Sequence, residues 1–130
     1  MSNIPTDLRY TRDHEWAKRE GGNVRVGITH YAQEQLGDVV FVELPKAGAP
    51  AAQRQSFGVV ESVKAVSDLY APVSGKVVEV NAELGKTPEL VNQDPYGRGW
   101  MIVIKPSNAA EWDQLLTAKQ YEEFLAQGGH

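Results

Sequence analysis

The chain contains no cysteine and only three histidines, His14, His30 and His130. Without cysteine it cannot form a disulfide, hold zinc through thiolates or use a cysteine nucleophile. No two of the histidines have the i, i+4 spacing that places two imidazoles on one face of a helix. We therefore expect no metal site.

A long apolar run is also absent. No stretch approaches the roughly 20 apolar residues that span a bilayer. Residues 1–7 have neither the basic cluster nor the hydrophobic segment of a secretion signal. We expect no membrane contact and a cytoplasmic protein of bacterial type, or a mitochondrial one if a transit peptide has been removed.

The chain has few basic residues, 13 Lys and Arg against 17 Asp and Glu, which gives a formal net charge of -4. An acidic protein repels phosphate backbones, so we expect no nucleic-acid partner. The sequence also has no phosphate-binding glycine loop and no Gly-x-Ser-x-Gly elbow. We expect that the protein is not an enzyme, and that any chemistry comes from a cofactor it carries.

What is present is a strand-rich pattern. With 130 residues, 42% of them hydrophobic, the chain has the size and composition of one globular domain. Short runs of Val and aromatic residues between Gly and Pro predict strands. They occur at residues 9–10, 16–19, 23–27, 38–44, 57–62, 66–70, 76–80 and 100–104. This pattern predicts a mainly-β sandwich or flattened barrel, with the nearly continuous apolar strand 38–44 buried.

Helices are predicted to be short and peripheral. Thr29 is expected to cap a helix that Gly37 ends. Asn108 with Glu111, and Thr117 with Gln120, have the spacing of capping boxes. We therefore predict a single domain over residues 1–130, with a core at about 8–106 and C-terminal helices at about 108–126.

Lys64 lies between the predicted strands 57–62 and 66–70, so we expect it at a hairpin tip. The tip, Val63-Lys64-Ala65, has none of the Gly, Asn or Asp residues that two-residue turns favour for their positive φ. A turn that departs from a local rule often marks a functional site.

Motifs in a fixed order surround this lysine. Glu61-Ser62-Val63-Lys64-Ala65 is followed by Ser67-Asp68 and Tyr70-Ala71-Pro72-Val73-Ser74-Gly75; further motifs are His14-Glu15-Trp16, Gly27-Ile28-Thr29, Gly37-Asp38-Val39-Val40-Phe41-Val42-Glu43-Leu44-Pro45, Asp94-Pro95-Tyr96-Gly97 and Gly99-Trp100. In order and spacing, across nearly the whole chain, they resemble the family of glycine cleavage system H proteins. The resemblance implies the biotinyl/lipoyl carrier fold, in which two small sheets expose a modified lysine.

The resemblance also implies a function. Lipoate, amide-linked to Lys64, would be the cofactor of a non-catalytic carrier in the glycine cleavage system. The carrier would take the aminomethyl group of glycine from glycine decarboxylase to an aminomethyltransferase, and dihydrolipoyl dehydrogenase would reoxidise it. A lipoate-attaching enzyme would be a further partner, and we expect a monomer.

Four more positions match the family's functional residues. The resemblance implies that Glu61 and Gly75 are recognised by the attaching enzyme, although a turn that needs positive φ explains Gly75 equally well. It implies that Glu15 and Asp68 contact the loaded arm, where a carboxylate can hold an ammonium. An ordinary exposed carboxylate at a strand end is the alternative for both acids.

Other carriers are the rival hypotheses. Biotinyl segments flank their lysine with Met, and acyltransferase lipoyl domains place Asp before it, whereas Val63 and Ala65 flank Lys64. An H-like protein that stores lipoyl groups or relays them to other enzymes stays open.

Overall fold

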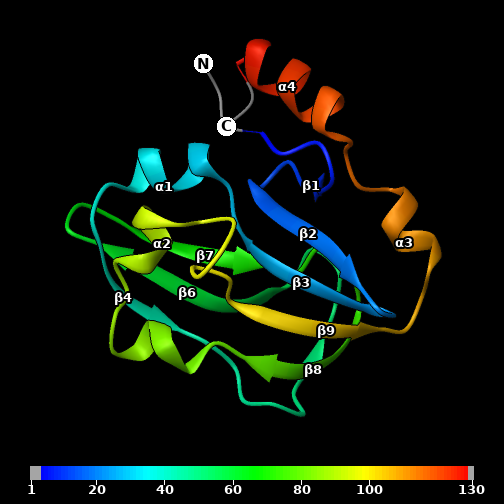
Figure 1. Ribbon diagram of the computed structural model, residues 1–130, viewed down its shortest axis with the longest axis horizontal. Coiled ribbons are helices and arrows are strands. Elements are labelled where there is room, and N and C mark those ends of the chain that lie inside the picture. The colour runs from blue at the N-terminus through cyan, green and yellow to red at the C-terminus, as the bar shows by residue number, and fades with distance from the viewer. Residues whose placement is uncertain (1–3, 129–130) are drawn as a thin grey trace.

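The computed structural model describes residues 4–128 and consists of two antiparallel β-sheets with short helices around them (Figure 1). The larger sheet has six strands in the order β1-β2-β3-β9-β8-β5, and the smaller has three in the order β4-β6-β7. Their bounds are β1 Arg9–Tyr10, β2 Glu15–Glu20, β3 Asn23–Ile28, β4 Val39–Glu43, β5 Pro50–Ala51, β6 Ser56–Ser62, β7 Val66–Tyr70, β8 Gly75–Val80 and β9 Ile102–Pro106. The predicted mainly-β sandwich is confirmed, but the sheets do not close into a barrel.

The helices are short, as expected: α1 His30–Leu36, the 3-10 helix η1 Ala82–Gly85, α2 Leu90–Gln93, α3 Ala110–Asp113 and α4 Ala118–Ala126. The Thr29 side chain accepts a hydrogen bond from the Ala32 N–H, and Gly37 ends α1 with a φ of 77°. Both predictions about α1 are therefore confirmed. The 3-10 helix η1 was not predicted from the sequence.

The main core lies between the two sheets, because alternate side chains of each strand point inward. The larger sheet contributes Val24, Val26, Val77, Ile102 and Ile104, and the smaller contributes Val39, Val42, Val60 and Leu69. Fully burying one such side chain stabilises the fold by about 1.5–3 kcal/mol. This core holds β6 and β7 against the body of the protein and so fixes the hairpin that carries Lys64.

A second cluster joins the C-terminal helix to the start of the chain. Tyr121 of α4 stacks on Tyr10 with ring centroids 4.7 Å apart and an interplanar angle of 8°. The Tyr121 hydroxyl lies 2.8 Å from Thr29 Oγ1 and 2.8 Å from His14 Nδ1. These contacts attach α4 to the residues around β2 and α1.

One of the two predicted capping boxes is present. Thr117 and Gln120 form a reciprocal box at the start of α4. Asn108 and Glu111 do not, because the Glu111 carboxylate accepts hydrogen bonds from the Ser74 N–H at 2.7 Å and the Ser74 hydroxyl at 2.9 Å. A backbone amide from a distant loop thus takes the side chain that the local pattern assigned to the helix, and α3 spans only Ala110–Asp113.

The strand predicted to be buried, β4, is only half buried. Val39 and Val42 point inward, whereas Val40 and Phe41 keep 49% and 51% of their surface exposed. A register shift between Val39 and Phe41 interrupts the pairing of β4 with β6. An irregularity of this kind turns two consecutive side chains to the same face, so a continuous apolar run was misleading here.

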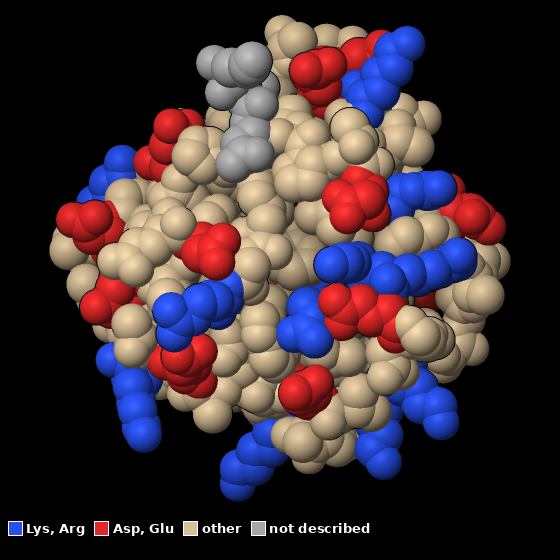
Figure 2. Space-filling model, in the orientation of Figure 1, with Lys and Arg blue, Asp and Glu red and all other residues tan. Residues whose placement is uncertain are grey.

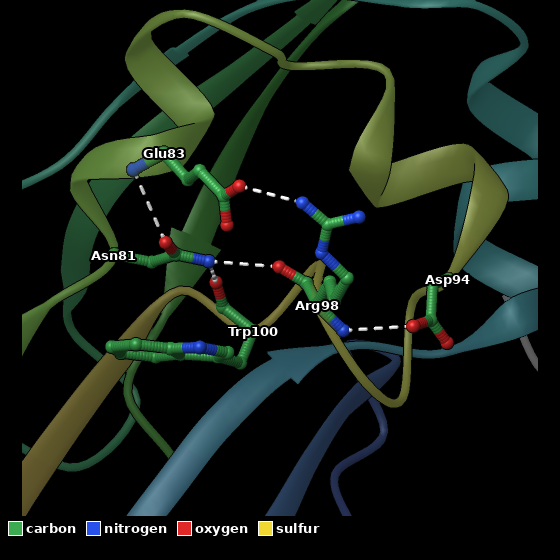
Figure 3. A network of polar contacts seen from close by, with 5 residues as sticks. All are labelled: Asn81, Glu83, Asp94, Arg98 and Trp100. Atoms are coloured by element: carbon green, nitrogen blue, oxygen red, sulfur yellow. Dashed lines mark hydrogen bonds and ion pairs between the residues drawn. The ribbon is translucent and has the colours of Figure 1, made fainter.

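The loop before β9 is fixed by a buried amide (Figure 3). Asn81 Nδ2 donates to the carbonyl oxygens of Arg98 at 2.9 Å and Trp100 at 2.7 Å, and Asn81 Oδ1 accepts from the Glu83 N–H at 3.2 Å. Arg98 also forms a 2.6 Å ion pair with Glu83. The Trp100 carbonyl accepts its hydrogen bond from Asn81 and not from a neighbouring strand. Strand β9 therefore begins at Ile102 rather than at residue 100 as predicted.

The charges on the side of the larger sheet are mixed in sign. Figure 2 shows acidic and basic side chains interspersed there, without a large region of one sign. Arg25, for example, forms a 2.9 Å ion pair with Glu20 and lies over the Trp100 ring. Within residues 4–128, no helix is long and apolar enough to cross a membrane.

Candidate functional site at the tip of the β6–β7 hairpin

Lys64 is exposed at the tip between β6 and β7, where the sequence predicted it. The turn is closed by a 2.8 Å hydrogen bond from the Ser62 N–H to the Ala65 carbonyl. The Ser62 hydroxyl accepts from the N–H groups of Lys64 at 3.3 Å and Ala65 at 3.1 Å. A serine side chain therefore satisfies the turn's backbone in place of the Gly or Asn expected there, and neither Val63 nor Lys64 needs a positive φ.

The tip is also attached to the body of the protein. The Val63 N–H donates a 3.0 Å hydrogen bond to the Asp38 carbonyl, in the segment that joins α1 to β4. Asn92 of α2 braces the same segment, because its side chain donates to the Gly37 carbonyl and accepts from the Val39 N–H, both at 2.8 Å. The backbone that carries Lys64 is therefore held in place, and mobility is left to its side chain.

The lysine stem lies over a glycine. A Cβ atom added at Gly37 would be 3.7 Å from Lys64 Cε, within ordinary van der Waals contact. The end of α1 thus gives the stem a flat, uncrowded surface.

A cleft of about 390 Å³ begins beside the tip and follows β7. Its walls come from the start of β2, from α1 and from residues 65–69, so Ala65 lies at the end next to Lys64. Ile28, Leu36 and Leu69 line it with apolar surface, whereas Asp68 and Glu15 supply carboxylates. The lining is therefore apolar at Ile28, Leu36 and Leu69 and acidic at Asp13, Glu15 and Asp68.

Glu15 is the buried acid at that far end, with only 2% of its surface exposed. Its Oε1 accepts from the Thr11 hydroxyl at 2.8 Å, and its Oε2 accepts from the Tyr70 N–H at 3.2 Å. Burial raises the pKa of Glu15 to about 8, although the hydrogen bonds from Thr11 and Tyr70 act in the opposite direction. A positive group entering the cleft would favour the ionised carboxylate.

The five predicted site residues do not form one cluster. Lys64, Asp68 and Glu15 follow one another along β7 and its cleft, from the tip to the far end. Glu61 is exposed and pairs in register with Phe41 and Val66, across the middle of the smaller sheet. Gly75 opens β8 in the larger sheet, and Figure 1 shows that this end of β8 lies on the opposite side of the molecule from the β6–β7 loop.

Gly75 has a clear packing requirement. A Cβ atom at this position would lie 2.0 Å from the Lys105 carbonyl oxygen and 2.9 Å from Ile104 Cγ2. Gly75 pairs with Pro106 of β9 and with Ala51 of β5, so it is enclosed between two strands. Only glycine fits this close approach of two backbones.

Sequence reasoning did not single out Ser62 or Thr11. The signal for Ser62 was available, since a serine beside a tight turn often bonds the backbone of the next residues. Nothing in the local sequence pointed to Thr11, whose hydroxyl also accepts from the Glu15 N–H at 3.1 Å.

Within residues 4–128 no group of three or more His, Cys, Asp or Glu could hold a metal ion. What the arrangement offers is an exposed amine on a fixed turn, beside a cleft with a buried carboxylate. That combination suits the attachment and shelter of a group whose chemistry is completed elsewhere.

Comparison with known proteins shows what the chain is similar to. The family model described as glycine cleavage H-protein matches residues 8–128. A glycine cleavage system H protein of Geobacillus kaustophilus is 59% identical over 126 residues, which cover 97% of this chain and 99% of the relative. One from Bacillus subtilis is 59% identical over 120 residues, covering 92% and 94%. The crystal structure of a glycine cleavage system H protein from Mycobacterium marinum superimposes with a TM-score of 0.85 at 46% identity, covering 98% of this chain and 100% of that one.

Proposed function

The chain belongs to the glycine cleavage H-protein family, and from this premise we propose that it carries a lipoyl group on Lys64 for the glycine cleavage system. The observation that carries the proposal is the position of Lys64, exposed on a turn that Ser62 closes and beside the cleft that ends at Glu15.

Lys64 provides the point of attachment. Its Nζ attacks the carbonyl carbon of an activated lipoyl donor supplied by the attaching enzyme, which forms an amide and releases the donor's leaving group and one proton. The product is neutral and longer than the lysine. The hydrogen bonds of Ser62 and Asp38 keep the backbone of the tip still while the side chain enters the partner.

The cleft provides shelter and charge. When attached, the lipoyl group supplies a disulfide that can be reduced, loaded with the aminomethyl group of glycine and reoxidised. Glu15, as a carboxylate, holds the ammonium of that load by a charge-assisted hydrogen bond. Asp68 contributes a second negative charge nearer the tip, and the apolar wall formed by Ile28, Leu36 and Leu69 excludes water.

The partners follow from this cycle. Glycine decarboxylase loads the arm, an aminomethyltransferase unloads it and dihydrolipoyl dehydrogenase reoxidises it, while this chain itself catalyses none of these reactions. One arm must visit all three enzymes, so each contact has to be small and reversible. A monomer in the bacterial cytoplasm meets this requirement.

The experiment is intact-protein mass spectrometry with peptide mapping, after incubation with lipoate and a lipoate-attaching enzyme. We expect one lipoyl mass increment, located on Lys64. Lys64→Arg should abolish it, and Lys76→Arg, which alters an exposed lysine on β8, should leave it intact. Folded wild-type protein that stays unmodified, or that is modified on another lysine, would overturn the proposal.

A second assay tests the pathway. The lipoylated protein should support glycine cleavage when mixed with the three purified enzymes, and the unmodified protein should not. Lipoylated protein that supports no cleavage, but passes its lipoyl group to another acceptor protein, would identify the relay instead.

A further inference from the structure

The Glu15 carboxyl group is held by two donors that come from different parts of the fold. The Tyr70 N–H of β7 donates to its Oε2 at 3.2 Å, and the Thr11 hydroxyl donates to its Oε1 at 2.8 Å. Within residues 4–128, Thr11 supplies the one side-chain hydrogen bond to this carboxyl group. A substitution can therefore remove the hydrogen bond from Thr11, whereas the one from the Tyr70 backbone stays in place.

The Thr11 hydroxyl has only one direction in which it can donate. A hydroxyl oxygen carries one proton and two lone pairs. Thr11 Oγ1 accepts from the N–H groups of Asp13 at 3.2 Å and Glu15 at 3.1 Å, so both lone pairs are occupied. The single proton is left for Glu15 Oε1. The hydroxyl thus acts toward the carboxyl group as a donor.

The loop between β1 and β2 folds back and brings Thr11 to this position. The Thr11 N–H donates to the Glu15 carbonyl at 3.0 Å, and the His14 N–H donates to the Thr11 carbonyl at 3.2 Å. His14 has a φ of 69°, a left-handed conformation that residues other than glycine seldom adopt. A tight loop with internal hydrogen bonds therefore fixes Thr11 relative to Glu15.

Thr11 lies behind Glu15 and outside the cleft. The lining of the cleft includes Asp13 and Glu15 but not Thr11, which lines a separate cavity of about 200 Å³. A group that enters the cleft therefore meets Glu15, and Thr11 acts on that group only through the carboxyl group it holds.

The Thr11 hydroxyl also favours the charged form of Glu15. Burial raises the pKa of Glu15 to about 8, and the hydrogen bond from Thr11 opposes this rise. An ammonium group in the cleft pairs with the ionised carboxylate, so a donor to that carboxylate makes the ion pair easier to form. Without the hydroxyl, the buried Oε1 would lose its donor and ionisation would cost more free energy.

We infer that Thr11 is a positioning residue for the loaded arm, because its hydroxyl holds the Glu15 carboxylate in the orientation that pairs with the ammonium of the aminomethyl load. This inference rests on the proposed function and extends it to a side chain outside the cleft. Thr11 itself makes no contact with the arm.

The first test needs no lipoyl group. Carbon NMR follows the Glu15 carboxyl group of the unmodified protein as the pH is raised. Thr11→Val keeps the shape of the side chain but removes the hydroxyl, so it should raise the pKa of Glu15 above the wild-type value. Thr11→Ser keeps the hydroxyl and should restore that value. Thr87→Val, which alters a half-buried threonine outside the cleft, is the matched control.

The other titratable groups near Glu15 are the same in all these proteins. They are Asp13 and His14 of its own loop, Tyr31 of α1, Asp68 and Tyr70 of β7 and Tyr121 of α4. A change in the titration of Glu15 between Thr11→Val and Thr11→Ser therefore reports the hydroxyl.

The second test follows the load. Lipoylated protein is loaded from glycine by glycine decarboxylase, separated from that enzyme and followed by intact-protein mass spectrometry. One water molecule releases the load as formaldehyde and ammonium and leaves a thiol on the arm, because the carbon–sulfur and carbon–nitrogen bonds both break. At pH 7, release should be about tenfold faster in Thr11→Val than in wild type, as expected when a hydrogen bond to a charged group is lost. Thr11→Ser and Thr87→Val should stay within about twofold.

A double-mutant cycle shows whether Thr11 acts through Glu15. Glu15→Gln cannot form the ion pair, so adding Thr11→Val to this variant should change the release rate by less than about twofold. Far-UV circular dichroism and thermal unfolding verify that each variant is folded. Thr11→Ala is the second variant if Thr11→Val is not.

The possible results separate the two proposals. A wild type that is never lipoylated overturns the proposed function, and the role of Thr11 toward the arm falls with it. A wild type that is lipoylated and loaded, but whose release rate is unaffected by Thr11→Val, overturns only the role of Thr11. An unchanged pKa of Glu15 in Thr11→Val, or an equal acceleration in the Glu15→Gln background, would show that Thr11 supports the loop alone and would overturn it too.

Discussion

The backbone N–H of Lys64 donates a 3.3 Å hydrogen bond to the side-chain hydroxyl of Ser62. The same hydroxyl accepts from Ala65 and so closes the turn without glycine or asparagine. Ser62 is buried, with 6% of its surface exposed, so water cannot easily replace it. Lys64 thus lies on a turn that the Ser62 side chain stabilises together with the backbone hydrogen bonds from Ser62 to Ala65 and from Val63 to Asp38.

Replacing this hydroxyl should loosen the tip. Ser62→Ala leaves the N–H groups of Lys64 and Ala65 without their side-chain acceptor, and we expect a loss of about 1 kcal/mol in the free energy of unfolding. Amide exchange at both positions should accelerate, and lipoylation should slow. Urea unfolding and hydrogen-exchange NMR measure these effects. Ser67→Ala is the control, because Ser67 is an exposed serine on β7 whose hydroxyl donates to the Asp68 carbonyl. Unchanged exchange at Lys64 in Ser62→Ala would show that the hydroxyl is dispensable.

Glu15 should make stability fall as the pH rises. Its pKa is raised from 4.5 to about 8 by burial, so between these values the folded protein binds more protons at this group than the unfolded chain does. The contribution is fully present below pH 4.5 and is lost as the pH rises toward 8. Each unit of pKa difference corresponds to about 1.4 kcal/mol.

Glu15→Gln replaces the titrating group with a neutral amide. The free energy of unfolding of this variant, relative to wild type, should increase between pH 5 and pH 8 by roughly 2–4 kcal/mol. Urea titrations at three pH values measure the difference. Glu79→Gln, which alters an exposed glutamate on β8, should show no such trend. A constant offset between Glu15→Gln and wild type at all three pH values would contradict the raised pKa.

Gly75 should matter for folding rather than for direct recognition. Gly75→Ala drives a Cβ into the Lys105 carbonyl oxygen, and we expect it to cost at least about 3 kcal/mol. Gly85→Ala is the control, because a Cβ there meets nothing within 4 Å. At low temperature, where part of Gly75→Ala remains folded, lipoylation of the folded fraction should match wild type. If Gly75→Ala is as stable as wild type but resists lipoylation, the attaching enzyme recognises Gly75 directly.

The sequence was informative where neighbouring residues decide the structure. The hairpin of β2 and β3 forms from the strands predicted at residues 16–19 and 23–27, and Gly21 and Gly22 in its turn take φ values of 56° and 94°. Strands β6 and β7 lie within one residue of their predicted bounds because Gly and Pro limit their apolar runs. The position of Lys64 at a hairpin tip follows directly from those two strands.

The sequence was less informative where residues far apart in the chain compete for the same contact. Glu111 has the spacing of a capping box, but Ser74, far away in the chain, takes its carboxylate. Phe41 belongs to an apolar run that predicts burial, yet its exposure depends on how β4 pairs with β6. The separation of Gly75 from Lys64 depends on which sheet each strand joins, and no local pattern contains that information. The spacing of the motifs identified Gly75 and Lys64, but it did not show that they lie on different sides of the molecule.

The C-terminal helix should support the cleft through one hydroxyl. Tyr121 bridges Thr29 Oγ1, which caps α1, and His14 Nδ1, whose residue lines the cleft next to Glu15. Tyr121→Phe keeps the ring stack on Tyr10 and removes only the bridge.

We expect Tyr121→Phe to lower the free energy of unfolding by about 1–2 kcal/mol, because a buried polar contact is lost while the apolar packing remains. A double-mutant cycle with Thr29→Val should give a coupling of at least about 0.5 kcal/mol, since the two side chains are in direct contact. Urea unfolding of the four proteins measures this coupling. Strictly additive losses would show that Tyr121 stabilises α4 alone and that the helix does not act on the cleft through Thr29.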